Sequence, residues 1–170
     1  WSWSPLFADF DNDGDKDLII ANGYPKDLTD KDWTNYKVMV FEYLAENQEI
    51  IDRAPAIKIP NLAFENTGNY GFVRKKNWLP DVPSFSYGAA FVDLDNDGDL
   101  DYVANNINDK AFIYRNYSVE KSKKDNCYIR IKLSGRKENT MAIGAKIELW
   151  NKGRYQFMEN YSNLRFTILD

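Results

Sequence analysis

Histidine is absent from this 170-residue chain, and cysteine occurs once, as Cys127. Without histidine, the chain cannot by itself form a Ser-His-Asp or Cys-His catalytic centre or a histidine-ligated zinc site. A single cysteine excludes a disulfide within the chain. No apolar run approaches the roughly 18 residues that a membrane-spanning helix needs, so we expect no membrane span in this chain.

The composition nevertheless predicts a folded protein, because 44% of the residues are hydrophobic and 15% are aromatic. Residues 1–118 hold 11 Lys/Arg and 20 Asp/Glu, whereas residues 119–170 hold 11 Lys/Arg and 6 Asp/Glu. This change of sign predicts a module boundary near residue 119. The start, Trp1-Ser2-Trp3-Ser4, has neither an initiating methionine nor a signal-like segment. We interpret the chain as an internal part of a longer protein.

One acidic pattern, D-x-D-N-D-G-D-x-D, occurs twice, at residues 9–17 and 93–101. When residues 1–22 are aligned with residues 85–106, ten positions are identical. Short apolar runs precede and follow each acidic segment, and such runs are typical of strands. We therefore predict that each acidic segment is a loop that closes a β hairpin.

Carboxylates packed this closely repel one another unless a cation lies among them. We expect side-chain ligands from positions 1, 3, 5 and 9, a backbone carbonyl from position 7, and a sharp turn at the glycine in position 6. The predicted metal residues are Asp9, Asp11, Asp13, Asp15 and Asp17 in the first loop and Asp93, Asp95, Asp97, Asp99 and Asp101 in the second. An all-oxygen set favours Ca²⁺ over zinc or copper, and Mg²⁺ prefers a stricter octahedron. The sequence thus predicts two calcium sites.

An EF-hand shares the first six positions of this pattern but needs a glutamate at position 12. That position is occupied by Ile20 in the first copy and by Ala104 in the second. The following residues also have a strand pattern rather than a helical one, which excludes an EF-hand. A solvated acidic turn without a metal is the plainer alternative, and it fits one copy better than two in the same context.

A second repeated element supports a repeat architecture. Residues 61–68 and 111–116 each contain a short apolar strand that ends in an aromatic residue, a charged residue and an asparagine, followed by a turn. Short strands at such spacing predict a β-propeller or another radial all-β array.

Residues 24–60 make the sequence distance between the two acidic segments longer than one repeat needs. Thr29 and Asp32 form a possible capping box, and apolar residues then recur at helical spacing up to Leu44. We predict one inserted helix over roughly 30–50. Its apolar stripe is interpreted as internal packing, with contact to a partner as the alternative.

The C-terminal part alternates apolar and polar residues at 129–133 and again at 143–149, which predicts a β hairpin with a basic face. We interpret this face as solvated or docked on the acidic repeats, with an acidic glycan or a protein partner as the alternative. Nucleic-acid binding is not expected, because the net charge is −4 and no nucleic-acid motif is present.

Residues 7–15 and 91–99 resemble FG-GAP/VCBS repeats, the β-propeller blade units of integrin α chains and many bacterial surface proteins. Residues 126–135 and 142–147 resemble the start of an ASPIC/UnbV domain, which follows such repeats in proteins related to cartilage acidic protein. The resemblance implies a mainly β fold: partial propeller blades with one inserted helix, followed by a C-terminal β module. The expected domains are residues 1–23 (partial repeat), 24–60 (helical insertion), 61–118 (repeat) and 119–170 (incomplete ASPIC/UnbV-like domain).

The resemblance further implies a calcium-dependent, non-enzymatic scaffold or adhesion module, extracellular or at the cell surface, with a protein or glycan as its partner. The alternative function is that of a polysaccharide-acting or glycan-binding protein. Glycosidases need two carboxylates, and carboxylates are abundant in this chain. The ten that cluster in the two acidic segments, out of 26 Asp and Glu residues, already have an expected role as metal ligands.

Overall fold

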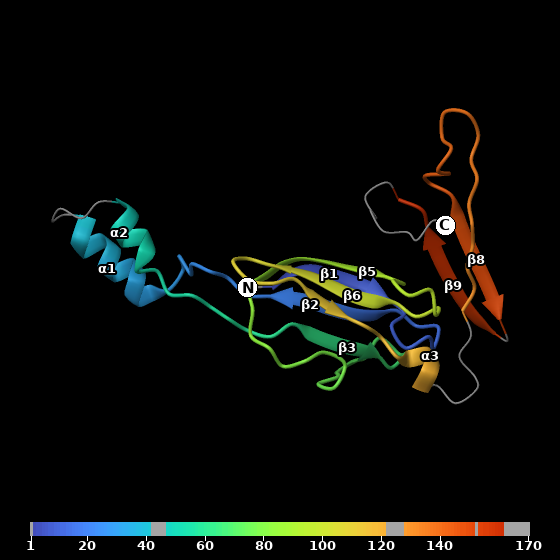
Figure 1. Cartoon of the computed structure of the whole chain (residues 1–170), viewed down its shortest axis with the longest axis horizontal. Coiled ribbons are helices and arrows are strands. Elements are labelled where there is room, and N and C mark those ends of the chain that lie inside the picture. Colours follow the sequence, from blue (N-terminus) through green and yellow to red (C-terminus); the bar gives the residue numbers. More distant parts are fainter. Residues whose placement is uncertain (1, 42–46, 122–127, 152, 162–170) are drawn as a thin grey trace.

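The computed structural model describes residues 2–41, 47–121, 128–151 and 153–161 (Figure 1). Nine strands and three short helices are defined within these ranges. They are, in chain order, β1 (Ser2–Ala8), β2 (Asp17–Asn22), α1 (Lys31–Phe41), α2 (Asn47–Asp52), β3 (Leu62–Asn66), β4 (Phe72–Arg74), β5 (Ser86–Val92), β6 (Asp101–Asn106), β7 (Phe112–Tyr114), α3 (Ser118–Lys121), β8 (Lys146–Asn151) and β9 (Arg154–Glu159). The predicted mainly β class is confirmed.

Two antiparallel sheets form the centre of the protein. One has the strand order β1-β2-β3-β4 and the other β5-β6-β7. The sheets lie against each other through β5, which contacts both β1 and β2. One hydrophobic core joins them, because apolar side chains from both sheets and from the adjoining loops pack together. Its buried members are Ala8, Phe10, Ile19, Ala63, Leu79, Tyr102 and Ala104.

The two sheets repeat one pattern of strand pairing, as the sequence predicts. Ser2 of β1 pairs with Asn22 of β2, and Ser86 of β5 pairs with Asn106 of β6. Each hairpin has an irregularity near this end, between Trp3 and Pro5 in β1 and between Ser86 and Gly88 in β5. The predicted hairpins and the predicted strands at 61–68 and 111–116 are therefore confirmed. A radial, propeller-like arrangement stays a prediction.

A buried chain of hydrogen bonds crosses between the sheets at the end away from the acidic loops. The Asn61 side-chain oxygen accepts from the Asn22 backbone N–H at 2.8 Å, and its amide donates to the Ser86 hydroxyl at 3.0 Å. The Ser86 hydroxyl in turn donates to the Asn106 side chain at 2.6 Å. Asn22 and Ser86 are almost fully buried. These polar groups are stable inside because they bond one another.

Two helices are described where the sequence predicted one over roughly 30–50, and the single-helix prediction is wrong. The Trp33 indole donates to the Ile50 carbonyl at 3.0 Å, and the two side chains share a small core with Ala54. In one continuous helix these residues would lie about 25 Å apart. The second helix instead folds back on the first (Figure 1). Leu44, the last member of the predicted stripe, lies outside the described residues.

The helix cap also differs from the prediction. The Asp30 carboxylate, rather than the Thr29 hydroxyl, accepts a hydrogen bond from a first-turn N–H, that of Trp33, at 2.8 Å. Thr29 donates its hydroxyl to Asp27 at 2.7 Å. Either residue type is a good N-cap, so the choice depends on the preceding turn. None of the described helices combines the length and the apolar character needed to cross a bilayer.

A C-terminal hairpin is formed, but one of its two strands differs from the prediction. β8 pairs with β9, and the predicted strand at 129–133 is not formed. Arg130, in the middle of that segment, instead contacts Asp93 at 2.9 Å. The ring of Tyr128 lies so close to Gly98 that an added Cβ would fall 1.9 Å from it. The alternating segment is thus used for contact with the second acidic loop rather than for strand pairing.

We predict that Asn61→Ala destabilises the protein by about 2–3 kcal/mol, because the buried N–H of Asn22 loses its acceptor. The measurement is urea unfolding followed by tryptophan fluorescence at one fixed calcium concentration. Asn77→Ala is the matched control, since Asn77 is exposed, and we expect it to change stability by less than about 0.5 kcal/mol. Equal effects of the two substitutions would contradict a structural role for the buried chain.

Candidate metal centre

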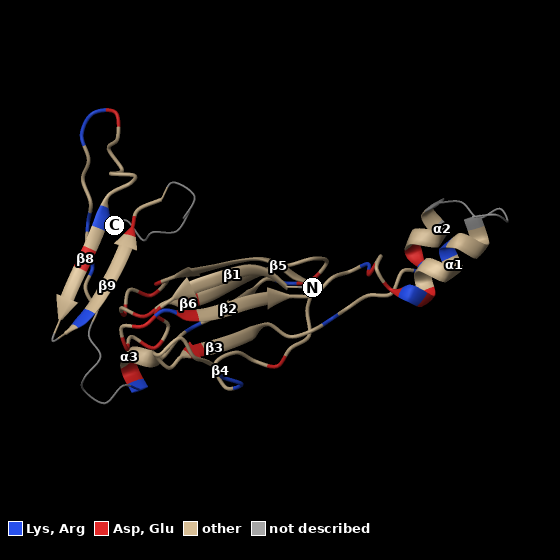
Figure 2. Ribbon diagram, turned by 180° about the vertical axis from the view of Figure 1, so that it is seen from behind, with Lys and Arg blue, Asp and Glu red and all other residues tan. Residues whose placement is uncertain are grey.

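The two acidic segments lie side by side. Loop 1 (residues 9–17) joins β1 to β2, and loop 2 (residues 93–101) joins β5 to β6. The Asn12 side-chain amide donates to the Gly98 carbonyl at 3.3 Å, which links the loops directly. Figure 2 shows the acidic residues gathered at this end of the sheets, towards the β8–β9 hairpin. Sheet packing therefore concentrates negative charge at one end.

Both loops have the same backbone shape. Asn12 and Gly14 have φ values of 58° and 98°, and Asn96 and Gly98 have 61° and 97°. These values lie in the left-handed region, which asparagine and glycine adopt most readily. The repeated asparagine and glycine thus explain why the two turns agree so closely.

The first aspartate of each loop holds the turn from inside. The Asp9 carboxylate accepts from the N–H groups of Asp13 at 3.1 Å and Gly14 at 2.9 Å. Asp93 accepts the two equivalent bonds in loop 2 at 3.1 and 3.2 Å. Each loop is therefore wrapped around its first carboxylate.

The last aspartate ties the loop to the neighbouring strand. Asp17 accepts from the N–H groups of Phe10 at 3.0 Å and Asn66 at 2.9 Å. Asp101 accepts the two equivalent hydrogen bonds in loop 2, from the Leu94 N–H at 2.9 Å and from the Asn116 N–H at 2.8 Å. Both aspartates are almost fully buried. The repeated asparagine noticed in the sequence thus has a role in the site that the sequence did not reveal.

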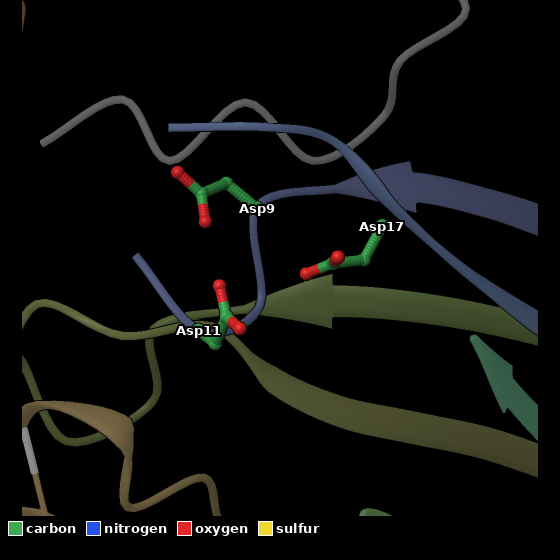
Figure 3. Close-up of side chains that lie close together, drawn as sticks. All are labelled: Asp9, Asp11 and Asp17. Atoms are coloured by element: carbon green, nitrogen blue, oxygen red, sulfur yellow. The ribbon is translucent and has the colours of Figure 1, made fainter. Parts of the chain in front are cut away.

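Three carboxylates converge in each loop, but not the same three. In loop 1, oxygen atoms of Asp9, Asp11 and Asp17 lie within 4.8 Å of one another (Figure 3). In loop 2 the corresponding group is Asp93, Asp95 and Asp97. Six of the ten predicted residues are therefore brought together as two separate groups.

The other four predicted residues lie outside these groups. The Asp13 carboxylate accepts from the Asp15 N–H at 2.8 Å, and the Asp15 side chain is exposed. Asp101 is used to brace loop 2, as described above. The expected contribution of Asp15 and Asp99 is a backbone carbonyl, which does not require their carboxylates to converge, and it stays a prediction.

Asp99 is buried in a way that the sequence did not indicate. Its side chain is 0% exposed, and its Oδ2 atom accepts from the Val119 N–H at 3.1 Å at the start of α3. Its Oδ1 atom has no hydrogen-bond partner among the described residues. A buried carboxylate oxygen without a partner costs free energy, so this position favours a bound cation or proton.

Burial and mutual repulsion make several carboxyl groups reluctant to ionise. Burial, then repulsion from Asp13 and Asp11, raises the pKa of Asp9 to about 6. Burial, then repulsion from Asp11 and Asp9, raises the pKa of Asp17 to about 7, although two N–H groups oppose the shift. Burial and the neighbouring Asp97 raise the pKa of Asp99 to about 6. The ionised forms of these carboxyl groups are therefore disfavoured unless a proton or a cation offsets their charge.

Two arginines contact the carboxylates of loop 2. Arg115 contacts Asp95 at 2.5 Å and Asp97 at 3.0 Å, and Arg130 contacts Asp93 at 2.9 Å. Although burial opposes the shift, the Asp99 N–H and Arg115 hold the pKa of Asp97 below its usual value. Neither arginine could be assigned to the site from the sequence, because both lie 14 or more residues beyond the loop.

Loop 1 is contacted through its backbone by the C-terminal hairpin. The Gln156 amide donates to the Gly14 carbonyl at 2.9 Å, and Arg154 donates to the Asp13 carbonyl. In the opposite direction, the Lys16 ammonium group of loop 1 donates a hydrogen bond to the Phe157 carbonyl at 3.3 Å. The hairpin thus docks on the acidic end of the sheets, as one interpretation of the basic segment predicted.

The donors of both groups are hard oxygen ligands, which suit Ca²⁺ or Mg²⁺ and exclude a thiolate or imidazole site at these positions. The unpartnered Asp99 oxygen and the raised carboxyl pKa values fit a dication at this end of the sheets. Asp9, Asp11 and Asp17 would hold it in loop 1, and Asp93, Asp95 and Asp97 in loop 2.

Comparison with protein-family models, with curated proteins and with solved structures gave no match.

We predict that the metal-free protein becomes less stable as the pH rises from about 4 to about 7. The folded pKa values of Asp9 and Asp17, about 6 and 7, exceed the ordinary aspartate value, so the folded state holds extra protons in this window. Stability falls with pH wherever the folded state binds more protons. The measurement is the melting temperature in a chelator across this range. A melting temperature that rises throughout the window would contradict the prediction.

Proposed function

We propose that this chain is a calcium-binding, non-enzymatic interaction module in which each acidic loop holds one Ca²⁺. The main support is the agreement between two loops 84 residues apart in sequence, which share φ values and hydrogen-bond partners. Each loop also brings three carboxylates within 4.8 Å. A solvated turn without a metal would not need the same inward-facing first carboxylate in both copies.

The mechanism is a linkage between ion binding and folding. Asp9 directly follows β1 and Asp17 begins β2, so their carboxylates approach only when the hairpin is formed. A bound Ca²⁺ supplies positive charge that offsets the repulsion among these groups. Since the unfolded chain lacks the arrangement, binding favours the folded state by about 2.7 kcal/mol per site at a hundred times the dissociation constant.

The proposal extends to the larger architecture. The packed antiparallel sheets with one loop each support the resemblance to FG-GAP/VCBS propeller blades. The hairpin that follows them supports the resemblance to an ASPIC/UnbV domain in position, since it docks on the blades. By this resemblance we propose an extracellular or cell-surface scaffold, whose partner is a protein or a glycan.

An enzyme acting on polysaccharides is less well supported. One hollow of about 320 Å³ lies beside β3 and β4, lined in part by Arg74, Lys75 and Lys76. It contains a single carboxylate, that of Asp81, whereas a glycosidase needs a pair. None of the loop aspartates lines it. The basic residues fit binding of an acidic group better than bond cleavage.

We predict that Ca²⁺ raises the melting temperature of the chelated protein by several degrees, and that Mg²⁺ raises it less. The expected size follows from about 2–4 °C per kcal/mol for a chain of this length. The double variant Asp11→Asn/Asp95→Asn should lose most of this rise, because one carboxylate charge is removed from each group. The measurement is a thermal melt at increasing Ca²⁺, with Mg²⁺ in parallel.

Asp81→Asn is the matched control, since Asp81 is an exposed aspartate outside both loops. Its response to Ca²⁺ should equal that of the unchanged protein. If the double variant kept the full rise, or if Mg²⁺ and Ca²⁺ acted equally, the proposed calcium sites would be wrong.

A further inference from the structure

The residues next to the two loops carry opposite charges at one structurally equivalent position outside the acidic pattern. Strand pairing places Phe64 opposite Leu18 and Tyr114 opposite Tyr102, which are equivalent partners in the two sheets. The residue that follows is therefore Glu65 beside loop 1 and Arg115 beside loop 2. The repeat thus reverses a charge next to otherwise matching sites.

This reversal acts on the converging carboxylates. Glu65 pairs with Lys75 at 2.6 Å, so the position beside loop 1 holds an ion pair without net charge. Arg115 instead contacts Asp95 at 2.5 Å and Asp97 at 3.0 Å. A cation approaching loop 1 therefore meets a neutralised ion pair at this position, whereas a cation approaching loop 2 meets a guanidinium that already contacts two of the carboxylates.

A second guanidinium completes the arrangement at loop 2. Arg130, in the segment before the C-terminal hairpin, contacts Asp93 at 2.9 Å, and the Asp93 side chain is only 6% exposed. All three converging carboxylates of loop 2 therefore contact an arginine. Asp9, the equivalent first carboxylate of loop 1, accepts the same two backbone bonds as Asp93, but among the described residues it forms no salt bridge with an arginine or a lysine.

We infer that the two loops are unequal calcium sites: loop 1 binds Ca²⁺ tightly, and loop 2 binds it weakly because Arg115 and Arg130 serve as its internal counter-ions. This inference rests on the proposed function. A dication that enters loop 2 must share or displace these guanidiniums. One positive charge about 5 Å from a dication lowers affinity about tenfold at the dielectric of water.

The segment before the C-terminal hairpin, which carries Arg130, thereby acquires a role at loop 2. Because Arg130 and Ca²⁺ compete for Asp93, binding at loop 2 weakens the contact between this segment and the blades. Tyr128, which packs against Gly98, comes from the same segment and is part of the same contact. Arg130 is a positioning and charge-compensating residue here rather than a ligand.

The test is calorimetric Ca²⁺ titration of the whole chain at low ionic strength. We expect a tight step and a weak step, the tight one lost in Asp11→Asn and the weak one in Asp95→Asn. Arg115→Gln should tighten the weak step about tenfold and leave the tight step unchanged. The inference would also be supported if the unchanged protein showed only the tight Ca²⁺-binding step and Arg115→Gln showed a second one.

Two variants serve as controls. Arg115→Lys keeps the positive charge, so its weak step should remain weak even if packing around Arg115 changes. Lys76→Gln removes one exposed charge outside both loops and should leave both steps unchanged. Equal affinities at the two loops, a tight step lost in Asp95→Asn, or no effect of Arg115→Gln would overturn the inference alone. If neither the unchanged protein nor any variant bound Ca²⁺, both the inference and the proposed function would be wrong.

Discussion

Repulsion among converging carboxylates is the constraint around which this end of the protein is arranged. Each loop turns inward on its first aspartate and is tied to the next strand by its last one, so the chain itself concentrates the charge. Backbone N–H groups offset part of this charge but not all of it, as the raised pKa values of Asp9 and Asp17 indicate. The remaining negative charge attracts whatever cation is within reach, whether a metal ion or an arginine.

The two copies meet this constraint in different ways. Loop 2 is compensated by side chains from distant parts of the sequence, Arg115 from the end of its own sheet and Arg130 from the C-terminal part. Loop 1 is contacted by the C-terminal hairpin mainly through backbone carbonyls, which leaves its carboxylate charge in place. A duplicated motif therefore need not give two equal sites, because the neighbours that set the local potential are not duplicated with it.

The other end of the sheets is arranged by hydrogen bonds rather than by charge. Asn22 and Asn106 occupy equivalent positions at the ends of β2 and β6, and both are buried. Asn61 and Ser86 connect them across the two sheets. The sheets are thus joined by an apolar core in the middle, by a satisfied polar chain at one end and by the acidic loops at the other.

The sequence by itself determined the hairpins and the local shape of both loops. The short apolar runs around each acidic segment and the left-handed tolerance of Asn12 and Gly14 are local properties, and they act the same way in both copies. These features, together with the mainly β class, could be predicted because no distant contact is needed to produce them.

Tertiary structure decided what local patterns cannot contain. The alternation at 129–133 is compatible with a strand, yet Arg130 gains a buried carboxylate partner by facing loop 2. The helical spacing after Thr29 does not show where the helix ends, because the turn back depends on Trp33 packing against Ile50. Which carboxylates converge, and which are neutralised, likewise depends on segments far apart in sequence, since electrostatic and packing energies are set by distance in space.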